Sequence, residues 1–509
     1  MNAKPFVTMQ RTYEDAVQAL NSLQTNAAVL EQLRKAGNAM NQRSMPEMIQ
    51  YVERIGYKVS DLNKLNVVHV AGTKGKGSTS AISDSILRRL RRVDNGGVER
   101  NIKTGLFTSP HLIEARERIR INGDPIEKQL FAKYFFEVWD ALGASRATAP
   151  GFENTPQRPQ YFRYLTLMAI HTFLQEQVDA VVLEVGMGGE YDSTNVVEKP
   201  IVCGITALGY DHTPLLGTTL AEIAWHKAGI MKTGVPVISA PQPAETIPVL
   251  EKRAEERQVA RYAVIDSKDF EYVQKRKLGL PGAYQQANGA LAVRLCQAWI
   301  EDQKIKGVQF VNEQAAIDSG LENAKWPGRA QKYVTPDHPG VTWYLDGAHT
   351  KESMQVCADW FEQEQQGSVP STDGQSRVLI FNCTKGRDGI VLLKSLVDLH
   401  RSSLPFSRVI FCSNDAYRPD FGPQRVDQIN NTVFRDEELL IQKELAAAWR
   451  TLSGSEGGAA KEVPIEIQPS IDDAVRSIVT DTNAKQNVLV TGSLYLIGGL
   501  LTVLKAPTM

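Results

Sequence analysis

VVHVAGTKGKGSTSAISDSILRRL, residues 67–90, begins as an apolar run, passes through a glycine-rich turn and continues as a helical pattern. Glycines in such a turn let backbone amides approach phosphate oxygens with no Cβ in the way. The N-terminus of the helix that follows adds a dipole favourable to anions. Lys76 would supply a positive charge for the β- and γ-phosphates of a nucleotide, and Ser78 a hydroxyl near its metal ion. The stretch predicts a phosphate-binding loop between a strand and a helix.

This loop departs from the strict Walker A pattern at two places. Val70 stands where that pattern has its first glycine, and Gly77 separates Lys76 from Ser78. The alternative interpretation is a glycine-rich turn that binds no ligand. Three glycines and two lysines within residues 72–77 favour phosphate binding over that alternative.

Apolar, β-branched runs alternate with helical patterns on both sides of the loop, which is typical of parallel sheets with crossover helices. A first set of strands and a second set after Arg329 predict two α/β domains, residues 1–328 and the smaller 329–509, separated near a Pro-Gly pair at 327–328. The expected strands are 66–70, 180–185, 201–207 and 235–239 in the first set, and 341–345, 377–382, 408–412 and 487–490 in the second. The expected helices include 80–92 and 161–175. Residues 146–160, 363–375 and 453–461 are predicted to be surface loops.

Acidic and histidine side chains follow two of these strands. Glu184 ends the run 180–184, and Asp211 and His212 follow the run 201–207. Carboxyl ends of parallel strands meet at one edge of a sheet, where such folds bind ligands. A carboxylate there suits Mg²⁺, although a charged residue that merely closes a strand is an equal alternative for Glu184 taken alone.

Two basic features have open interpretations. Lys227 lies in an apolar helical segment and is either a snorkelling surface lysine, which we favour from the residues alone, or a buried lysine that must be paired, neutralised or modified. Arg116, Arg118 and Arg120 either recognise carboxylates or form a solvated charged face.

Composition excludes some classes of protein. The 509 residues carry a formal net charge of −1, which argues against a nucleic-acid or membrane-surface binder. Five scattered cysteines have no zinc spacing, so we expect neither a disulfide framework nor a zinc site. The uncharged run 486–504 is broken by glycines and is interpreted as a strand, a turn and a packed helix rather than a membrane span. The N-terminal residues lack the apolar core of a secretory signal.

The motifs taken together resemble the folylpolyglutamate synthases, within the wider family of Mur-type amino-acid ligases. They occur in family order over about residues 67–350, and the set is far more specific than any one member. Residues 161–173 and the length of the chain resemble the eukaryotic branch. The matching pieces are GTKGKGST (72–79), FTSPHLIEARERIRING (107–123), YFRYLTLMAIHTF (161–173), LEVGMGGEYDSTN (183–195), GYDHT (209–213), HKAGIMK (226–232), WPGR (326–329) and DGAHT (346–350).

This resemblance implies a fold and site residues. The fold would be Mur ligase-like, with a P-loop-containing parallel-sheet domain that binds ATP, folate at the domain cleft, and a Rossmann-like second domain on the glutamate side. Lys227 matches a lysine that is carbamylated in related ligases, and would be catalytic together with Lys76. The other implied roles are ATP binding by Gly75, Lys76, Gly77, Ser78, Arg329 and Asp346, and Mg²⁺ coordination by Ser109, Glu184 and His212.

The implied activity is ATP-dependent addition of L-glutamate to tetrahydrofolate and its polyglutamates, with Mg²⁺ and a monovalent cation such as K⁺ as cofactors. A monomer in the cytoplasm, with a mitochondrial pool, is expected. Alternatives are a dihydrofolate synthase, a ligase for a cell-wall precursor, and a nucleotide-binding regulator without ligase activity. The sequence departs from the family at Thr350-Lys351, where Asn-Pro is common, and at residues 282–288, where a His–Asn pattern is common. Both departures leave the roles of His349 and Asn288 open.

Overall fold

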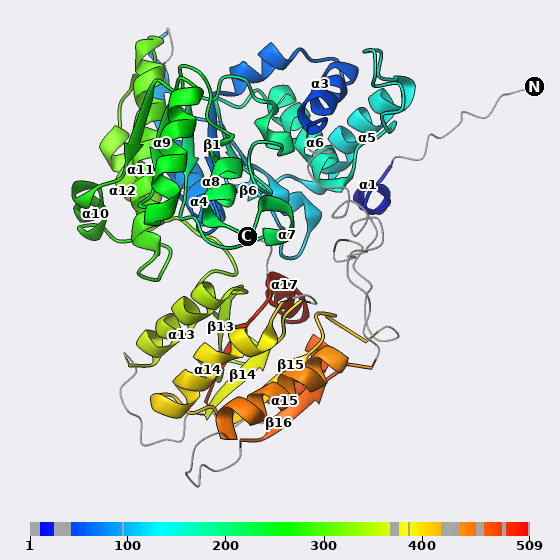
Figure 1. Ribbon diagram of the computed structural model, residues 1–509, viewed down its shortest axis with the longest axis vertical. Coiled ribbons are helices and arrows are strands. Elements are labelled where there is room, and N and C mark those ends of the chain that lie inside the picture. Colours follow the sequence, from blue (N-terminus) through cyan, green and yellow to red (C-terminus); the bar gives the residue numbers. More distant parts are fainter. Residues whose placement is uncertain are drawn as a thin grey trace, which may run out of the picture.

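The protein folds into two lobes, each built around its own sheet (Figure 1). A computed structural model describes residues 11–24, 42–93, 96–366, 376–384, 387–418, 427, 438–454, 463–480 and 485–506. The first sheet lies within residues 67–264 and the second within residues 331–491. The mixed α/β architecture with parallel sheets confirms the expected fold class.

The first sheet has eight strands in the order β10-β9-β8-β1-β7-β4-β5-β6. The ladders from β10 to β4 are parallel, whereas the β4–β5 and β5–β6 ladders at the other edge are antiparallel. Strands β4, β7, β1 and β8 therefore end at the same edge of the sheet. The bounds are β1 Val67–Ala71, β4 Thr104–Phe107, β5 Ile119–Ile121, β6 Asp124–Pro125, β7 Ala180–Glu184, β8 Val202–Ile205, β9 Pro236–Ser239 and β10 Arg261–Val264.

Helices cover both faces of this sheet, because alternate residues of each strand point to opposite faces. Val67 of β1 packs into the core formed with α1, α3, α5 and α6, whereas Val68 and Val70 pack into the core formed with α4, α11 and α12. Helices α8 and α9 pack on the end of the sheet nearest β9. The helices of this lobe are α1 Tyr13–Asn21, α3 Ser44–Arg54, α4 Lys76–Leu87, α5 Lys128–Ala144, α6 Tyr161–Gln175, α7 Thr213–Leu216, α8 Leu220–Ala228, α9 Ile247–Glu256, α10 Ser267–Gln274, α11 Gln285–Ile305 and α12 Glu313–Glu322.

The second sheet has six strands in the order β12-β13-β17-β14-β15-β16, and only β12 is antiparallel to its neighbour. Helices α13, α14 and α15 cover one face, and α16 and α17 cover the other. The elements are β12 Gln331–Val334, β13 Val341–Asp346, α13 Lys351–Gln366, β14 Ser376–Phe381, α14 Gly389–Ser402, β15 Arg408–Cys412, α15 Leu440–Gly454, β16 Ile465–Gln468, α16 Ile471–Val479, β17 Gln486–Thr491 and α17 Leu494–Val503.

Several expectations need correction or completion. The helix after the phosphate loop begins at Lys76 rather than at residue 80. Residues 363–366 belong to α13 and residues 453–454 to α15, and the rest of both expected loops lies outside the described residues. A small antiparallel sheet, not expected from the sequence, joins β2 Arg91–Val93, β3 Glu99–Asn101 and β11 Gln309–Phe310.

The C-terminal run folds as expected from its glycines. Strand β17 is buried along its whole length, and a turn at Gly492 leads into the buried helix α17. In the described part of the chain, no helix is both long and apolar enough to cross a membrane. All five cysteines are buried and free, in agreement with the expected absence of a disulfide framework.

Candidate active site

The phosphate loop connects the end of β1 to the start of α4 at the edge where four parallel strands end. The first helical hydrogen bond of α4 runs from the Thr79 amide to the Gly75 carbonyl, at 2.8 Å. The amides of Lys76, Gly77 and Ser78 therefore belong to the first turn, whose N–H groups have no partner within a helix. Lys76 Nζ lies 3.1 Å from the Gly72 carbonyl oxygen. The loop combines free amides, a helix dipole and a lysine, as an anion site requires.

Position 75 requires a glycine, both for its backbone conformation and because a side chain would have no space there. Its φ of +90° lies in the left-handed region, and a Cβ built there would stand 2.1 Å from Asn288 Oδ1. Gly75→Ala is therefore expected to displace the loop and weaken ATP binding by roughly tenfold or more, since each 1.4 kcal/mol of strain is a factor of ten. Titration of a fluorescent ATP analogue measures this effect.

Gly97→Ala is the matched control for this substitution. Gly97 also has a positive φ, +78°, but nothing lies within 4 Å of a Cβ built there, and it stands in the β2–β3 turn. We expect Gly97→Ala to cost stability without changing nucleotide affinity. Equal nucleotide affinity of the Gly75→Ala protein and the wild type would contradict the assignment of this loop to ATP.

Helix α11 supplies contacts to the loop that the sequence did not predict. Gln285 Nε2 donates to Ser78 Oγ at 3.3 Å, and Asn288 Nδ2 donates to Gln285 Oε1 at 2.8 Å. Trp326 packs over Gly77, where a Cβ would stand 2.8 Å from the indole Nε1. The only sequence signal was the polar residues at the start of an otherwise apolar helix. Gln285 and Asn288 thus fix the loop from the side.

Glu184 and Ser109 meet at the ends of β7 and β4. The Ser109 amide donates to Glu184 Oε2 at 3.0 Å, and the Glu184 side chain is buried. Burial raises the pKa of Glu184, and the positive charges of Lys76 and Arg329 act in the opposite direction. Among the described residues, no basic nitrogen pairs with this carboxylate within 4.0 Å, so it is a buried acid without a cationic partner.

The donor set at this edge fits Mg²⁺, which takes oxygen ligands and keeps waters and substrate phosphates rather than requiring a protein cage. Glu184 offers the carboxylate oxygen, and Ser109 a hydroxyl on the adjacent strand end. In the described part of the chain, no group of three or more His, Cys, Asp or Glu side chains is placed to hold a metal ion. A site here would consequently depend on the nucleotide phosphates for its remaining ligands.

His212 stands at the same edge, in the segment that follows β8. Its backbone is left-handed, with φ of +53°, immediately before α7. Within the described residues its ring has no hydrogen bond, while its amide donates to Asp211 Oδ1 at 3.0 Å. Burial lowers the pKa of His212, which keeps the imidazole neutral and able to donate a lone pair.

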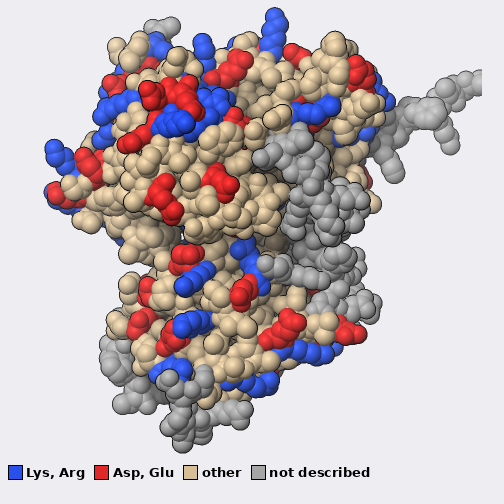
Figure 2. All heavy atoms as spheres, in the orientation of Figure 1, with Lys and Arg blue, Asp and Glu red and all other residues tan. Residues whose placement is uncertain are grey.

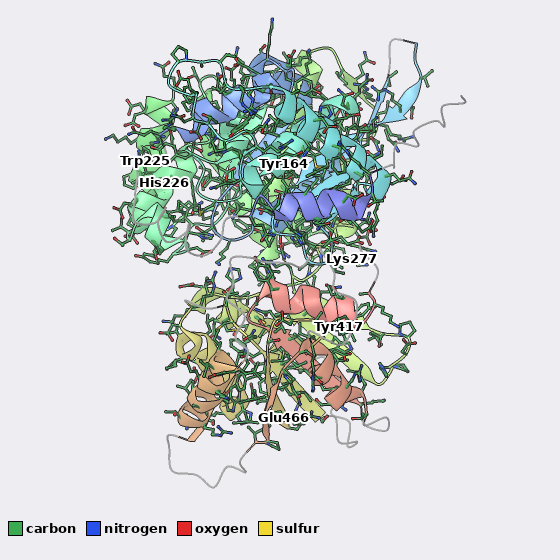
Figure 3. All side chains as sticks on the ribbon, turned by 90° about the vertical axis from the view of Figure 1, so that its right-hand side faces the viewer. Tyr164, Trp225, His226, Lys277, Tyr417 and Glu466 are labelled. Atoms are coloured by element: carbon green, nitrogen blue, oxygen red, sulfur yellow. The ribbon has the colours of Figure 1, made fainter. Side chains whose placement is uncertain are left out.

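Lys227 is buried, so its interpretation as a snorkelling surface lysine is wrong. The side chain is 3 % exposed, and Nζ donates to the Gly72 carbonyl at 2.7 Å. Its neighbours Trp225 and His226 lie at the outer side of the first lobe (Figure 3), and α8 turns Lys227 inward. Burial, followed by repulsion from Lys76, lowers the pKa of Lys227 well below its usual value. The helix therefore places a second lysine beneath the phosphate loop.

Arg329 and Asp346 lie together where the chain enters the second lobe. Asp346 accepts hydrogen bonds from the amides of Ala330 (2.8 Å) and Ala348 (2.9 Å), so its carboxylate fixes the segment next to Arg329. Burial raises the pKa of Asp346, and the charge of Arg329 opposes that rise. The Arg329 guanidinium has no ion pair within 4.0 Å among the described residues. It is thus available to an anion between the lobes.

The three arginines after β4 are engaged within the protein. Arg116 pairs with Glu114 at 2.7 Å, and Arg118 Nε donates to His111 Nδ1 at 2.9 Å. Arg120 is buried and donates to the carbonyls of Glu117 and Gly123. These contacts are not those of a fully solvated charged face, and recognition of a substrate carboxylate by these arginines stays a prediction.

Comparison with known proteins agrees with this geometry. The chain is 41 % identical, over 98 % of its length and 88 % of theirs, to folylpolyglutamate synthases of two Saccharomyces cerevisiae strains, FostersO and ATCC 204508 / S288c. No family model matches the chain.

Solved structures establish the fold. A Mycobacterium tuberculosis folylpolyglutamate synthase complexed with ADP and AMPPCP has a TM-score of 0.63 and 23 % identity, covering 90 % of this chain and 96 % of that one. The apo form of L. casei FPGS has a TM-score of 0.66 and 21 % identity, covering 97 % of this chain and 100 % of that one. Escherichia coli FolC in complex with DHPP and ADP has a TM-score of 0.59 and 23 % identity, covering 90 % and 93 %.

Proposed function

Because this chain belongs to the folylpolyglutamate synthase family, we propose that it is an ATP-dependent ligase that adds L-glutamate to the γ-carboxylate of tetrahydrofolate and its polyglutamates. The observation that carries the proposal is the phosphate loop, with Lys76 above it, at the edge where Glu184 ends β7. ADP and phosphate would be the other products.

Chemistry explains why such a ligase needs ATP. A carboxylate does not react with an amine at neutral pH, because oxide is a poor leaving group. Phosphorylation of the folate γ-carboxylate gives an acyl phosphate, which the amine of glutamate attacks to form the amide and release phosphate. The first half is a phosphoryl transfer, which needs positioning and neutralisation of charge more than covalent chemistry from the protein.

The described residues have the properties that these steps require. The amides of Lys76, Gly77 and Ser78 would bind the phosphates, and Lys76 Nζ would neutralise charge on the transferred group. Asp346 orients the segment that carries Arg329, whose guanidinium would bind the same phosphates from the second lobe. Lys227 would orient the loop through Gly72. Its carbamylation stays a prediction, which an intact-mass measurement on active protein would test.

Ser109, Glu184 and His212 would hold Mg²⁺, and when bound the ion would supply charge neutralisation for the phosphates. Ser109 and Glu184 are fixed to one another by a hydrogen bond, so the two ligands would be preorganised. A monovalent cation, the cytoplasmic and mitochondrial locations and the monomeric state stay predictions.

The proposed active site has residues from both lobes, and the two domains would have different roles in it. We propose that residues 1–328 bind ATP, with folate at the cleft between the domains, and that residues 329–509 form the glutamate side. Figure 2 shows side chains of both charge signs along the narrowing between the lobes. Closure of the lobes around the acyl phosphate would exclude water and protect it from hydrolysis.

Coupling between substrates tests this proposal. Release of ADP should require folate, and steady turnover should require glutamate as well, since the acyl phosphate is consumed only by the amine. Phosphate release measured with tetrahydrofolate, glutamate or both would report this coupling. ATP hydrolysis at an equal rate without glutamate would overturn the ligase proposal in favour of a nucleotide-dependent regulator.

A further inference from the structure

Asp211 lies between two cations that come from different lobes. Its Oδ2 is 3.6 Å from Lys74 Nζ of the phosphate loop, and its Oδ1 is 3.9 Å from Arg387 Nη2 of the second lobe. The Asp211 side chain is 14 % exposed, so solvent screens these contacts only in part. None of these three residues has a role in the reaction described above.

Arg387 is held by the second lobe while it reaches Asp211. It stands between β14 and α14, and its Nη1 donates to the carbonyl of His349 at 2.8 Å. His349 Nδ1 in turn lies 2.7 Å from the Gly347 carbonyl. Arg387 is thereby tied to the segment after β13, the same segment that Asp346 fixes beside Arg329. A displacement of Arg387 would be transmitted to that segment.

Lys74 is equally bound to the first lobe. Its backbone amide and that of Thr73 both donate to the Ala207 carbonyl at 3.0 Å, which fixes the loop to the segment that carries Asp211. The carboxylate therefore has one cation in its own lobe and one in the other. Loss of its charge would leave Lys74 and Arg387 facing each other with no anion between them.

The lengths of the two contacts distinguish this carboxylate from a structural one. Asp179 also receives two arginines, but at 3.0 Å from Arg92 and 3.1 Å from Arg100, all within the first lobe. The longer contacts at Asp211 attract both cations without a direct hydrogen bond to either. Such a link can align the lobes and still release when substrates enter or products leave.

We infer that Asp211 is a positioning residue of the ligation reaction, whose carboxylate aligns Arg387 of the second lobe with Lys74 of the phosphate loop. This inference rests on the proposed function, because alignment of the lobes matters only if the reaction takes place between them. Asp211 acts through the two cations and touches no reacting atom.

Asp211→Asn tests the inference, with Asp179→Asn as the matched control of similar burial and two cationic partners. We expect Asp211→Asn to lower kcat by about 10- to 30-fold with KM for ATP within about threefold, since the phosphate loop is retained. Asp211→Glu, with a longer reach to both cations, should recover at least about a third of the wild-type kcat. Asp179→Asn should change thermal stability but leave kcat per folded molecule unchanged.

A double-mutant cycle with Arg387→Gln tests whether the two residues act through each other. The double variant should have a kcat within about twofold of the slower single variant, because either change breaks the same link. The inference would be overturned if the loss of kcat in the double variant equalled the product of the two single losses. It would also be overturned if Asp211→Asn had the kcat of the wild type. Absence of any glutamylated product from the wild-type protein would instead overturn the proposed function, so the two failures can be told apart.

Discussion

Replacing Lys76 with methionine is expected to lower kcat for ligation by about 10²- to 10³-fold, the usual loss when one preorganised group that stabilises transition-state charge is removed. Lys76 is the first residue of α4, so its charge lies beside the free amides of the first helical turn. Its Nζ lies over the loop, 3.1 Å from the Gly72 carbonyl. Methionine keeps much of the length of the side chain and removes its charge together with the hydrogen bond to the Gly72 carbonyl. The loop should retain its conformation, because Gly75 and the Ser78–Gln285 hydrogen bond do not depend on that charge.

Steady-state phosphate release and thermal unfolding, measured on the same preparation, separate catalysis from folding. Lys252→Met is the control, since Lys252 is a surface residue of α9 with a side chain that is 75 % exposed. The control should match the wild type in both measurements. A Lys76→Met protein with wild-type kcat would refute the assignment of the phosphate loop as the site of phosphoryl transfer.

Arg329→Ala is expected to reduce ligation by about 10²-fold or more while the protein stays folded. The guanidinium lies against Gly347, where a Cβ would stand 2.5 Å from Nη1, and no described residue pairs with it. Removing it therefore breaks no ion pair of the described protein. What is lost is a charge that the second lobe presents to the phosphates, and with it the electrostatic reason for the lobes to close.

Single-turnover formation of product, with thermal unfolding as the folding control, would measure this effect. Arg329→Lys should recover only part of the rate, because an ammonium lacks the planar, bidentate geometry of a guanidinium. Arg401→Ala, at an exposed position near the end of α14, should behave as the wild type. Near-normal turnover of Arg329→Ala would contradict a reaction that takes place between closed lobes.

Much of the fold was predictable because buried parallel strands are continuous apolar runs. Strand β15 and helix α6 begin and end where expected, β13 is longer by one residue at its end, and β14 and β17 differ by one residue at each end. The strand ends also predicted that Glu184 and the loop before α7 would lie at the edge that carries the phosphate loop. Local pattern was sufficient there, since strand direction alone places these residues.

The remaining contacts depend on tertiary packing that no local pattern records. Lys227 has the same residues beside it in sequence whether it is buried or snorkels, and only the placement of α8 against the loop decides. Gln285 reaches Ser78 across more than two hundred residues of chain. The short strands β2, β3 and β11 are polar and largely exposed at the β2–β3 hairpin, so no apolar run marks them. A role for Asp211 could be inferred only after the structure placed Arg387 of the second lobe beside it.

Mass spectrometry of the folate products tests the central proposal most directly. The purified chain would receive Mg-ATP and glutamate with either tetrahydrofolate or dihydropteroate. We predict a series of products from tetrahydrofolate that differ by successive glutamate additions, and no product from dihydropteroate. Glutamate addition to dihydropteroate alone would identify a dihydrofolate synthase, and ATP binding with neither product would contradict folate ligation altogether.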